Sequence, residues 1–526
     1  MKYGFGISRI RLVPYGGRHN DTICTAEEKT SSYERIETDQ ELSLKSAVDN
    51  CELDKVDKKL INALQSLPTD YWDFKDADTK EYTHGLHTYP AVMISEISRN
   101  ILRIMKKLIP IQTLFDPFSG SGTVLVEGML AGINQVKGND INPLALFLEK
   151  VKTTSIDSLQ MQEDYERLIS RLDNEYTLLN PYVTSCNSYI QDVLELDVTS
   201  KEGWGIDAVK HLSDYCNQYN LDIEIPDFKN IGYWFKPNVI LELSLIKKII
   251  KATTNKDIQD FFFVAFSETI RLVSNRRNGE FKMYRMPPAK VEKHSPDVKK
   301  EFLSILKRNI LKMHEFNIAL EEVSTKSAIT IYKNSACDLK SVDNDCFDLI
   351  ITSPPYGDSR TTVAYGEFSR LSLQWIDLFE LSDKDIMNVD CSLMGGMKFR
   401  NGFEFSLNSQ TVQQSLNDIG EKNIERAGDV FSFYKDLEKS IKEIARTTKE
   451  GGYHFWIVGN RTVKGVTLET DKIIAEMAEK YNMKYVYSVG RFISNKVMPS
   501  LNSPSNKTGE TAATMTNEHI VILRKI

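Results

Sequence analysis

Apolar residues recur along this chain with two different spacings, which predict helices and strands in alternation. Between residues 94 and 109, Ile97, Ile101 and Met105 share one face of a predicted helix. Short apolar runs bounded by glycine, proline or polar residues are typical of buried strands. Seven segments fit that description: 113–118, 135–141, 328–335, 346–357, 451–460, 483–492 and 518–526.

This alternation predicts an α/β fold, with a doubly wound, mostly parallel seven-stranded sheet and helices on both faces. The pattern occupies residues 81–150 and 328–526 and stops between them. Residues 151–327 carry many helical patterns and few strand signals, so we expect a large, mainly helical insertion there. We also expect a short strand and a polar arm within residues 1–80, and a second insertion at 390–430.

Composition limits the classes of protein that fit. The chain has 526 residues, of which 41% are hydrophobic, and this is enough for a substantial core. Its 66 Lys and Arg against 73 Asp and Glu give a net charge of −7, so a surface for nucleic acid must be local. The seven cysteines lack CxxC spacing, which argues against a disulfide framework and a zinc site. We therefore expect no bound metal. The chain also has no membrane-length apolar run and no signal-peptide pattern, so we expect a cytoplasmic protein.

A glycine turn follows the first predicted strand, in the sequence Asp116-Pro117-Phe118-Ser119-Gly120-Ser121-Gly122-Thr123. Glycine lets a backbone approach a ligand closely. Asp140, 18 residues after Gly122 at the end of the next strand, can accept two hydrogen bonds from a ribose diol. The GxG spacing, with no Lys after it, weakens a dinucleotide or nucleoside triphosphate site. A sulfonium cofactor, which has a ribose and a carboxylate but no phosphate, fits better; a simple tight turn is the alternative.

A proline turn, Thr352-Ser353-Pro354-Pro355-Tyr356-Gly357, ends the most apolar predicted strand. Two consecutive prolines remove two N–H donors and leave carbonyl groups as acceptors. An exocyclic amine can donate to such acceptors, while a planar heterocycle stacks on Tyr356. We therefore predict a catalytic turn that works by positioning the amine, formed by Ser353, Pro354, Pro355 and Tyr356. A structural Pro-Pro loop beside a core tyrosine is the alternative.

The pair DPFSGSGT and TSPPYG resembles the S-adenosylmethionine-dependent amino-methyltransferases of DNA, and TSPPY resembles their cytosine-N4 branch. HGLHTYP at 84–90 is similar to the segment of that family that closes over the methionine end of the cofactor. SACD at 335–338 is similar to its adenine-reading position. The resemblance covers about 82–150 and 328–526. It implies a class I methyltransferase-like fold and S-adenosylmethionine as cofactor.

The resemblance also implies a set of contacts in this chain. Ser353, Pro354 and Tyr356 would hold the amine of a base that is flipped out of duplex DNA. Asp140 would bind the ribose of the cofactor, and Asp338 would bind its adenine. The remaining cofactor contacts would come from Tyr89, Pro90, Asp116, Phe118, Ser119, Gly120, Gly122 and Thr123.

One stretch is locally basic. Residues 271–312 hold 12 Lys or Arg and 4 Asp or Glu, a charge of +8. Arginines mixed with Asn, Ser and an aromatic residue suit contacts to phosphates and base edges, although a solvated helix face is the common alternative. The candidates for DNA binding are Arg271, Arg276, Arg277, Lys282 and Arg285, with Lys398 and Arg400 of the second insertion.

Three functions are compatible with these features. The favoured one is a site-specific methyltransferase of double-stranded DNA acting on cytosine N4, with adenine N6 as the alternative target, in restriction-modification or related defence beside a restriction endonuclease. The second is an RNA methyltransferase acting on guanine N2 in tRNA. Those enzymes more often have Asp before Pro-Pro and an N-terminal RNA-binding module, which residues 1–80 are too short to form. A non-enzymatic scaffold ranks last because both turns are intact.

Overall fold

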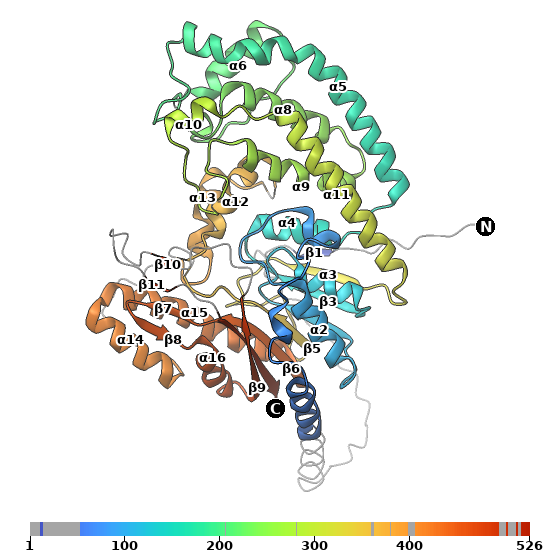
Figure 1. The fold of residues 1–526 in the computed structure, drawn as a ribbon, viewed down its shortest axis with the longest axis vertical. Helices are drawn as coiled ribbons and strands as arrows, with labels where there is room; N and C mark the ends of the chain where they lie inside the picture. The colour runs from blue at the N-terminus through green and yellow to red at the C-terminus, as the bar shows by residue number, and fades with distance from the viewer. Residues whose placement is uncertain are drawn as a thin grey trace, which may run out of the picture.

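The chain folds into a sheet-containing domain with a helical body stacked on it (Figure 1). The computed structural model describes residues 11–13, 53–205, 207–279, 281–358, 362–378, 380–397, 406–493, 501–502, 512–513 and 517–526. In the described part of the chain, no helix is both long enough and apolar enough to cross a membrane.

The centre of the lower domain is an eight-stranded sheet in the order β1-β4-β3-β2-β5-β6-β12-β9. Neighbouring strands from β1 to β6 are parallel, whereas β12 is antiparallel to both β6 and β9. All seven predicted strands are present, and β1 from the N-terminal region adds an eighth at the edge. The strands are β1 (Arg11–Val13), β2 (Thr113–Asp116), β3 (Gln135–Asn139), β4 (Ala328–Tyr332), β5 (Phe347–Thr352), β6 (Thr448–Gly459), β9 (Met483–Phe492) and β12 (Asn517–Lys525).

Helices cover both faces of this sheet, as the sequence predicts. Along β5, Leu349 and Ile351 enter one apolar cluster, and Ile350 enters the other, because successive side chains of a strand point to opposite faces. Helical residues 53–65 pack on the first face, and three helices complete that layer: α2 (Ser95–Met105), α3 (Thr123–Leu130) and α4 (Pro143–Lys152). The second face is covered by α14 (Gln410–Lys422), α15 (Ile424–Thr447) and α16 (Thr470–Glu479).

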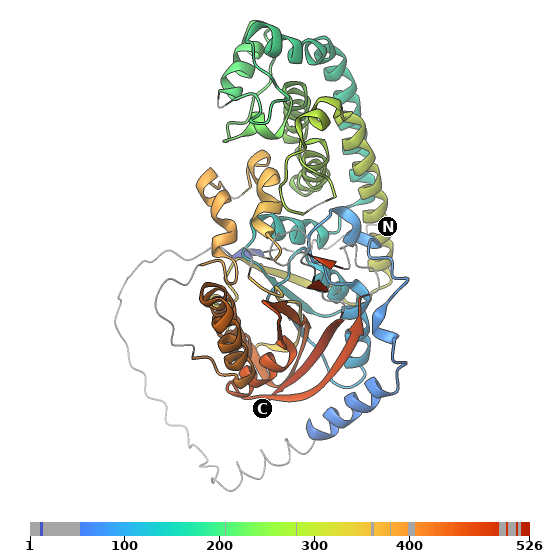
Figure 2. The ribbon, with the colours of Figure 1, turned by 60° about the vertical axis from the view of Figure 1, so that its left-hand side comes forward.

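The predicted helical insertion leaves the sheet after β3 and returns at β4, which is the hydrogen-bonded neighbour of β3. Its apolar core is continuous with the first face of the sheet. In both ribbon views α11 runs from the insertion down to the sheet domain (Figures 1 and 2). The insertion contains α5 (Ser158–Ser188), α6 (Ala208–Gln218), α7 (Ile231–Trp234), α8 (Pro237–Lys251), α9 (Lys256–Val273), α10 (Pro288–Lys293) and α11 (Val298–Glu321).

Helix α12 (Tyr365–Trp375) belongs to the sheet domain but ends inside the insertion. The fully buried ring of Trp375 lies 5.5 Å from that of Phe235, between ring centroids. It lies 6.1 Å from the rings of both Phe228 and Phe266. The two bodies therefore share one aromatic cluster, and α13 (Asp383–Ser392) packs beside α12.

The segment predicted as a second insertion, 390–430, is mostly regular structure. Helix α14 and the beginning of α15 pack on the sheet and supply Val412, Leu416 and Ile419 to its second apolar cluster. Shorter elements complete the chain: η1 (Tyr71–Asp73), η2 (Tyr82–Leu86), η3 (Tyr189–Val193), the hairpin β7 (Arg461–Val463) with β8 (Val466–Leu468), and the pair β10 (Leu501–Asn502) and β11 (Ala512–Ala513).

A buried ion pair fastens the N-terminal helical residues to the last strand. Asp57 accepts hydrogen bonds from Nε of Arg524, at 3.0 Å, and from the hydroxyl of Tyr453, at 2.7 Å. Asp54, which is half exposed, also accepts from Arg524 at 3.0 Å. The guanidinium of Arg524 is almost entirely enclosed, so these carboxylates balance a charge that water cannot reach.

Candidate active site

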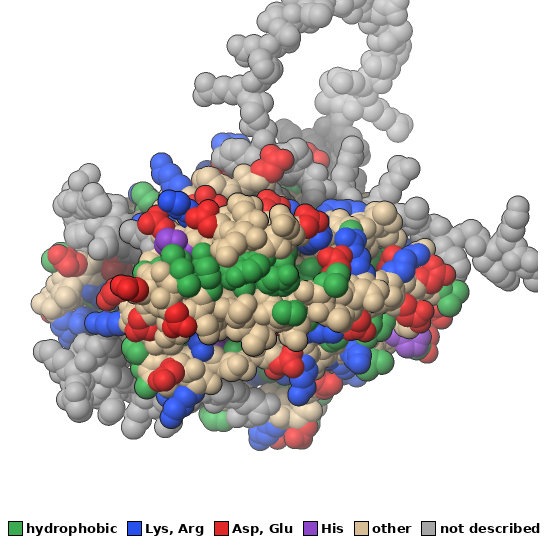
Figure 3. Space-filling view, turned by 90° about the horizontal axis from the view of Figure 1, so that it is seen from above, with side chains coloured by type: hydrophobic (Ala, Val, Ile, Leu, Met, Phe, Trp, Pro, Cys, Tyr) green, Lys and Arg blue, Asp and Glu red, His purple; other side chains and the backbone are tan. Residues whose placement is uncertain are grey.

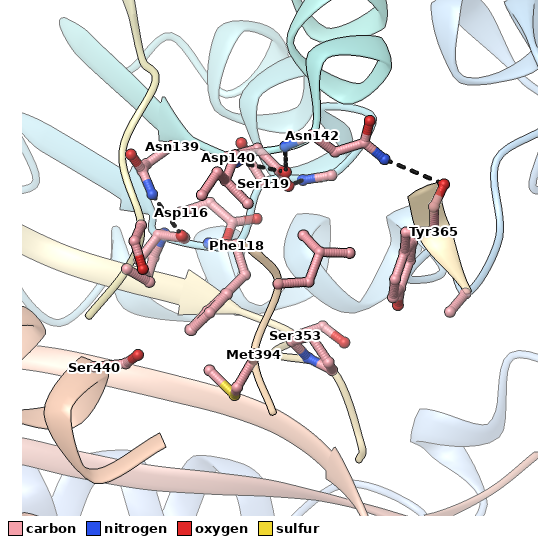
Figure 4. Close-up of a pocket in the computed structure, with 18 of the residues that line it drawn as sticks. Asp116, Phe118, Ser119, Asn139, Asp140, Asn142, Ser353, Tyr365, Met394 and Ser440 are labelled. Carbon is pink, nitrogen blue, oxygen red and sulfur yellow. Dashed lines mark hydrogen bonds between the residues drawn. The ribbon is translucent and has the colours of Figure 1, made fainter. Parts of the chain in front are cut away.

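A cavity of about 340 Å³ opens where β2, β3, β4 and β5 end (Figure 4). In sheets of this type a ligand binds outside the carboxyl ends of the strands, at the point where the strand order reverses. Here that point lies between β2 and β5. The glycine turn contributes Gly120 to the wall, and the proline turn contributes Ser353 and Pro355. The two motifs of the sequence therefore share one cavity.

The glycine turn has the backbone that its sequence suggests. Gly120 and Gly122 have φ angles of +53° and +85°, a left-handed region that side chains disfavour. Phe118, Ser119, Gly120 and Thr123 line the cavity. Gly122 does not line it; a Cβ at this position would lie 3.2 Å from Cα of Glu149. Gly122 is thus required for packing of the turn against α4.

Asp140 holds the turn in place from the end of β3. Its Oδ2 accepts a hydrogen bond from the backbone N–H of Gly120 at 2.9 Å. Its Oδ1 accepts from the N–H groups of Ile141 and Asn142, each at 2.8 Å. The carboxylate also lines the cavity, as a ribose-binding group would.

Three carboxyl groups lie around the turn. Asp116 and Asp140 line the cavity, while Glu149 is fully buried in α4. Burial raises the pKa of Asp116 to about 7. Burial also raises the pKa of Asp140 and, more strongly, that of Glu149. A cationic ligand would offset this cost because it favours the ionised form of each carboxyl group.

Asn142 was not singled out in the sequence, yet it connects three parts of the site. Its amide nitrogen donates to the hydroxyl of Tyr89 at 3.0 Å and to Oγ of Ser369 in α12 at 2.9 Å. Its Oδ1 accepts from the N–H of Leu144 and so caps α4. The Asn-Pro pair that opens α4 is the available sequence signal, since Asn at an N-cap followed by Pro is a helix start.

The segment before α2 contributes to the cavity. Tyr89 and Pro90 line the wall. The Tyr89 ring packs against the rings of Tyr365 and Phe368 in α12, with centroids 6.0 Å and 5.8 Å apart. Across the cavity, Met394 and Met397 of the segment after α13 complete an apolar wall.

The segment at 335–338, predicted to bind the adenine of the cofactor, contributes only part of its length to the cavity. Residues 334–337 line the cavity just after β4. Asp338 is not among the lining residues, and its carboxylate pairs with Lys340 at 2.8 Å. Its backbone N–H donates to the carbonyl of Ser335 at 2.9 Å, which shapes the turn.

The proline turn projects from the end of β5. Ser353 and Pro355 face the cavity, Pro354 is buried, and the ring of Tyr356 is half buried behind them. The Tyr356 hydroxyl donates to Oε1 of Glu518 at 3.0 Å and lies 3.4 Å from Oγ of Ser353. Glu518, the second residue of β12, was not predicted, because a single polar residue at the beginning of a strand carries no signal.

The basic stretch, residues 271–312, differs from its prediction in one respect. Arg271 and Arg276 are only 3% and 4% exposed, so they do not form a surface for phosphates. Arg271 stacks on the ring of Phe368, 3.5 Å from its centroid, and donates to the Phe368 carbonyl. Nε of Arg276 donates to the carbonyl of Arg271 at 3.1 Å. Both line a smaller cavity of about 220 Å³ with His87, Thr88, Glu268 and Phe281.

The other basic candidates vary in exposure. Arg285 is half buried and donates to the carbonyls of Tyr233, at 2.8 Å, and Ser200, at 2.6 Å. Arg277 is exposed and Lys282 is half buried. Lys398 and Arg400 lie outside the described residues. On the outer end of the insertion, positive and negative side chains are interspersed around a strip of apolar ones, so that face has no uniformly basic surface (Figure 3).

Comparison with known proteins places the chain among methyltransferases. Residues 47–171 match the model of a family described as an RMKL-like methyltransferase domain. The chain is 41% identical over 481 residues to the Type II methyltransferase M.MvaI of Kocuria varians, a match that covers 90% of this chain and 96% of that protein. It is 22% identical over 339 residues to the Type II methyltransferase M.MjaII of Methanocaldococcus jannaschii, covering 54% of this chain and 62% of that protein.

Among solved structures, the rRNA methyltransferase aviRa from Streptomyces viridochromogenes aligns at a TM-score of 0.29 and 9% identity, over 87% of this chain and 96% of that one. The strand order and the sequence matches together define a methyltransferase. More narrowly, the chain belongs to the family of Type II methyltransferases, which are DNA methyltransferases. Family and fold imply S-adenosylmethionine as the methyl donor.

The residues around the cavity fit that cofactor. The carboxyl groups of Asp116 and Asp140 suit a positively charged ligand with a ribose, and the turn at 334–337 offers backbone groups near apolar Phe118. Ser119 also lines this space, while its hydroxyl is buried beside the carboxyl group of Glu149.

Proposed function

We propose that this protein methylates the exocyclic N4 amine of cytosine in double-stranded DNA, at a specific sequence. The single observation that carries the proposal is the shared cavity, in which Gly120 lies on one wall and Ser353 and Pro355 lie on another. Such an arrangement brings a methyl donor and an acceptor amine together, and positioning of this kind can supply most of a catalytic effect.

The residues divide the work between two ligands. Asp140, Ser119 and the 334–337 turn would hold S-adenosylmethionine, with Tyr89 and Pro90 covering it. When bound, this cofactor supplies an electrophilic methyl group on a sulfonium. The Oγ of Ser353 and the carbonyl of Pro354 would accept hydrogen bonds from the amine and direct its lone pair toward that methyl group. The half-buried ring of Tyr356 would support the base.

Duplex DNA is the proposed partner, and the base must leave the helix before it can react. Flipping costs a few kcal/mol, about what unstacking and unpairing require. Within the basic stretch, exposed Arg277 and half-buried Lys282 would contribute contacts to phosphates. We place the enzyme in restriction-modification or a related defence, together with a restriction endonuclease that cuts the unmethylated sequence.

Serine before Pro-Pro-Tyr supports cytosine N4 over adenine N6. To test the proposal, we would incubate the purified chain with labelled S-adenosylmethionine and either duplex DNA or tRNA, then identify the modified nucleoside. We expect label in DNA as N4-methylcytosine, and sequencing would locate its target sequence. N6-methyladenine alone would overturn the choice of base, and label in tRNA alone would overturn DNA as substrate.

A matched pair of variants tests the site itself. Ser353→Ala removes an acceptor from the cavity wall, and we expect at least a tenfold slower methylation with unchanged cofactor binding. Thr462→Ala changes an exposed hydroxyl in β7 and should leave the rate unchanged. Full activity in Ser353→Ala would remove that residue from the proposed mechanism.

A further inference from the structure

A chain of hydrogen bonds leads from the cavity to a carboxylate behind it. Oγ of Ser353, in the cavity wall, lies 3.4 Å from the hydroxyl oxygen of Tyr356. That hydroxyl lies 3.0 Å from Oε1 of Glu518 in β12. The side chain of Glu518 is 13% exposed. The proline turn is thus connected to a buried acid that the sequence motif does not contain.

Arg491 of β9 forms an ion pair with Glu518. One nitrogen of its guanidinium donates to Oε2 of Glu518. Its Nε donates to the carbonyl of Trp72 in η1 at 2.8 Å, and the side chain is almost fully buried. The carboxylate of this ion pair offers only acceptors to Tyr356.

This fixed acceptor determines the direction of every bond in the chain. A tyrosine hydroxyl has one proton, and the proton of Tyr356 is directed to Glu518. The lone pairs of Tyr356 then face Ser353, so the proton of Ser353 is directed to Tyr356. Only the lone pairs of Ser353 remain for a ligand in the cavity. With its own proton directed to Tyr356, the Ser353 hydroxyl accepts a hydrogen bond from the ligand instead of donating one.

We propose that Glu518 is a positioning residue, which orients the Ser353–Tyr356 pair to accept from an exocyclic amine and receives the proton that the amine releases. The inference rests on the proposed function. It predicts selection of bases with an amino group, such as cytosine and adenine, over bases with a carbonyl oxygen at the same position. Burial and the Glu518 carboxylate raise the pKa of Tyr356, so this hydroxyl keeps its proton at neutral pH.

The proton transfer balances along the same chain. The nitrogen forms its bond to the methyl carbon as the bond from that carbon to the sulfonium sulfur breaks, and the sulfur keeps the electron pair. The nitrogen then carries one proton in excess. That proton passes to Oγ of Ser353 while the Ser353 proton moves to Tyr356 and the Tyr356 proton moves to Oε1 of Glu518. The methylated base is then neutral and Glu518 is protonated. Solvent removes that proton and restores the carboxylate. Within the described residues, the charged group that contacts Glu518 is Arg491.

The test uses the full-length chain and the target sequence found as described above. Glu518→Gln keeps the shape of the side chain but adds a donor and removes the charge. We expect its single-turnover methylation rate to fall roughly 100-fold, the usual scale for a lost proton acceptor, while the dissociation constant for S-adenosylmethionine stays unchanged. The matched control is Glu450→Gln, an exposed carboxylate in β6, which should behave as wild type.

A binding measurement without cofactor adds a readout that does not depend on turnover. Wild-type protein should bind a duplex with cytosine at the target position about tenfold more tightly than one with uracil, which has a carbonyl in place of the amine. In Glu518→Gln that preference should disappear, because a Gln side chain can reverse the direction of the bonds. A wild-type rate and an intact preference in this variant would overturn the proposal.

If Glu518→Gln does not fold, Tyr356→Phe provides a second test of the proposal. It removes only the middle hydroxyl, and we expect a similar fall in rate. The double variant should be no slower than either single one, since the three groups act as a unit. Additive losses would overturn the proposal. If wild-type protein methylates no DNA, the proposed function has failed instead, and this inference falls with it.

Discussion

The hydroxyl of Thr352, the last residue of β5, donates a 2.6 Å hydrogen bond to Oδ1 of Asp116, the last residue of β2. The two residues stand 236 positions apart, one in the proline turn and one in the glycine turn. Asp116 also accepts from the N–H of Phe118 at 3.1 Å. This buried contact, beside the pairing of β2 with β5, joins the two motifs that form the cavity.

Removing that donor tests how much the alignment contributes. Thr352→Val keeps the shape of the side chain and leaves a buried carboxyl group without its side-chain partner. We expect the free energy of unfolding to fall by about 1–3 kcal/mol, the usual cost of an unsatisfied buried group. Urea denaturation measures it. Thr462→Val, at an exposed position of β7, is the control and should change stability by less than about 0.5 kcal/mol.

Stability should also depend on pH through Asp116. Its pKa is raised to about 7 in the folded protein and is roughly 3.9 in an unfolded chain. The folded state therefore binds a proton that the unfolded state has released, and this stabilising contribution is present below about pH 4 and lost as the pH rises to 7. Asp116→Asn has no such proton. Between pH 5 and pH 8 its stability should improve relative to wild type by about 2 kcal/mol. Parallel pH profiles of the two proteins would contradict this.

A separate prediction concerns Gly122, whose φ angle lies in the left-handed region. Gly122→Ala places a Cβ 3.2 Å from Glu149 in a backbone conformation that costs roughly 1–2 kcal/mol for any other residue. We expect lower stability and weaker binding of S-adenosylmethionine, measured by denaturation and calorimetric titration. Gly279→Ala is the matched control, since a Cβ there would have no neighbour within 4 Å. Equal effects of the two substitutions would show that the turn tolerates a side chain.

The ion pair between Asp57 and Arg524, which attaches the N-terminal helical residues to β12, can be tested in the same way. Asp57→Ala leaves the enclosed guanidinium of Arg524 without its main partner, and we expect a loss of about 3–5 kcal/mol in the free energy of unfolding. Asp54→Ala removes a half-exposed partner of the same arginine, and because water screens that pair it should lower the free energy of unfolding much less than Asp57→Ala. A smaller effect at Asp57 than at Asp54 would mean that the buried pair is not the anchor.

The DNA surface can be located by the salt dependence of binding. Replacing Arg277 and Lys282 by Gln should each reduce the slope of log affinity against log salt concentration by about 1 if each contacts a phosphate. Lys472→Gln in α16, on the far side of the sheet from the insertion, should leave the slope unchanged. Unchanged slopes in both loop variants would move the DNA surface away from this loop.

Most of the fold could be predicted because most strands of the sheet are short apolar runs bounded by glycine, proline or polar residues. The two turns revealed the cavity for the same reason, since few residues other than glycine and proline allow those backbones. The direction of a side chain on a fully buried element could not be predicted. Helix α9 is apolar almost all round, so nothing in its sequence showed that Arg271 points inward. Glu518 was missed because Tyr356, its partner, lies 162 residues away in the chain.

Helix α12 has one end in each body of the protein. Tyr365 at its N-terminus belongs to the cavity wall, and Trp375 at its C-terminus, about 15 Å away, is fixed among rings of the insertion. An α-helix transmits displacement along its axis like a short rod. If the helical body binds the proposed duplex, a tilt of that body would shift one boundary of the ligand space. Linkage would then require the converse: a molecule bound in that space would change the affinity for DNA by the same factor.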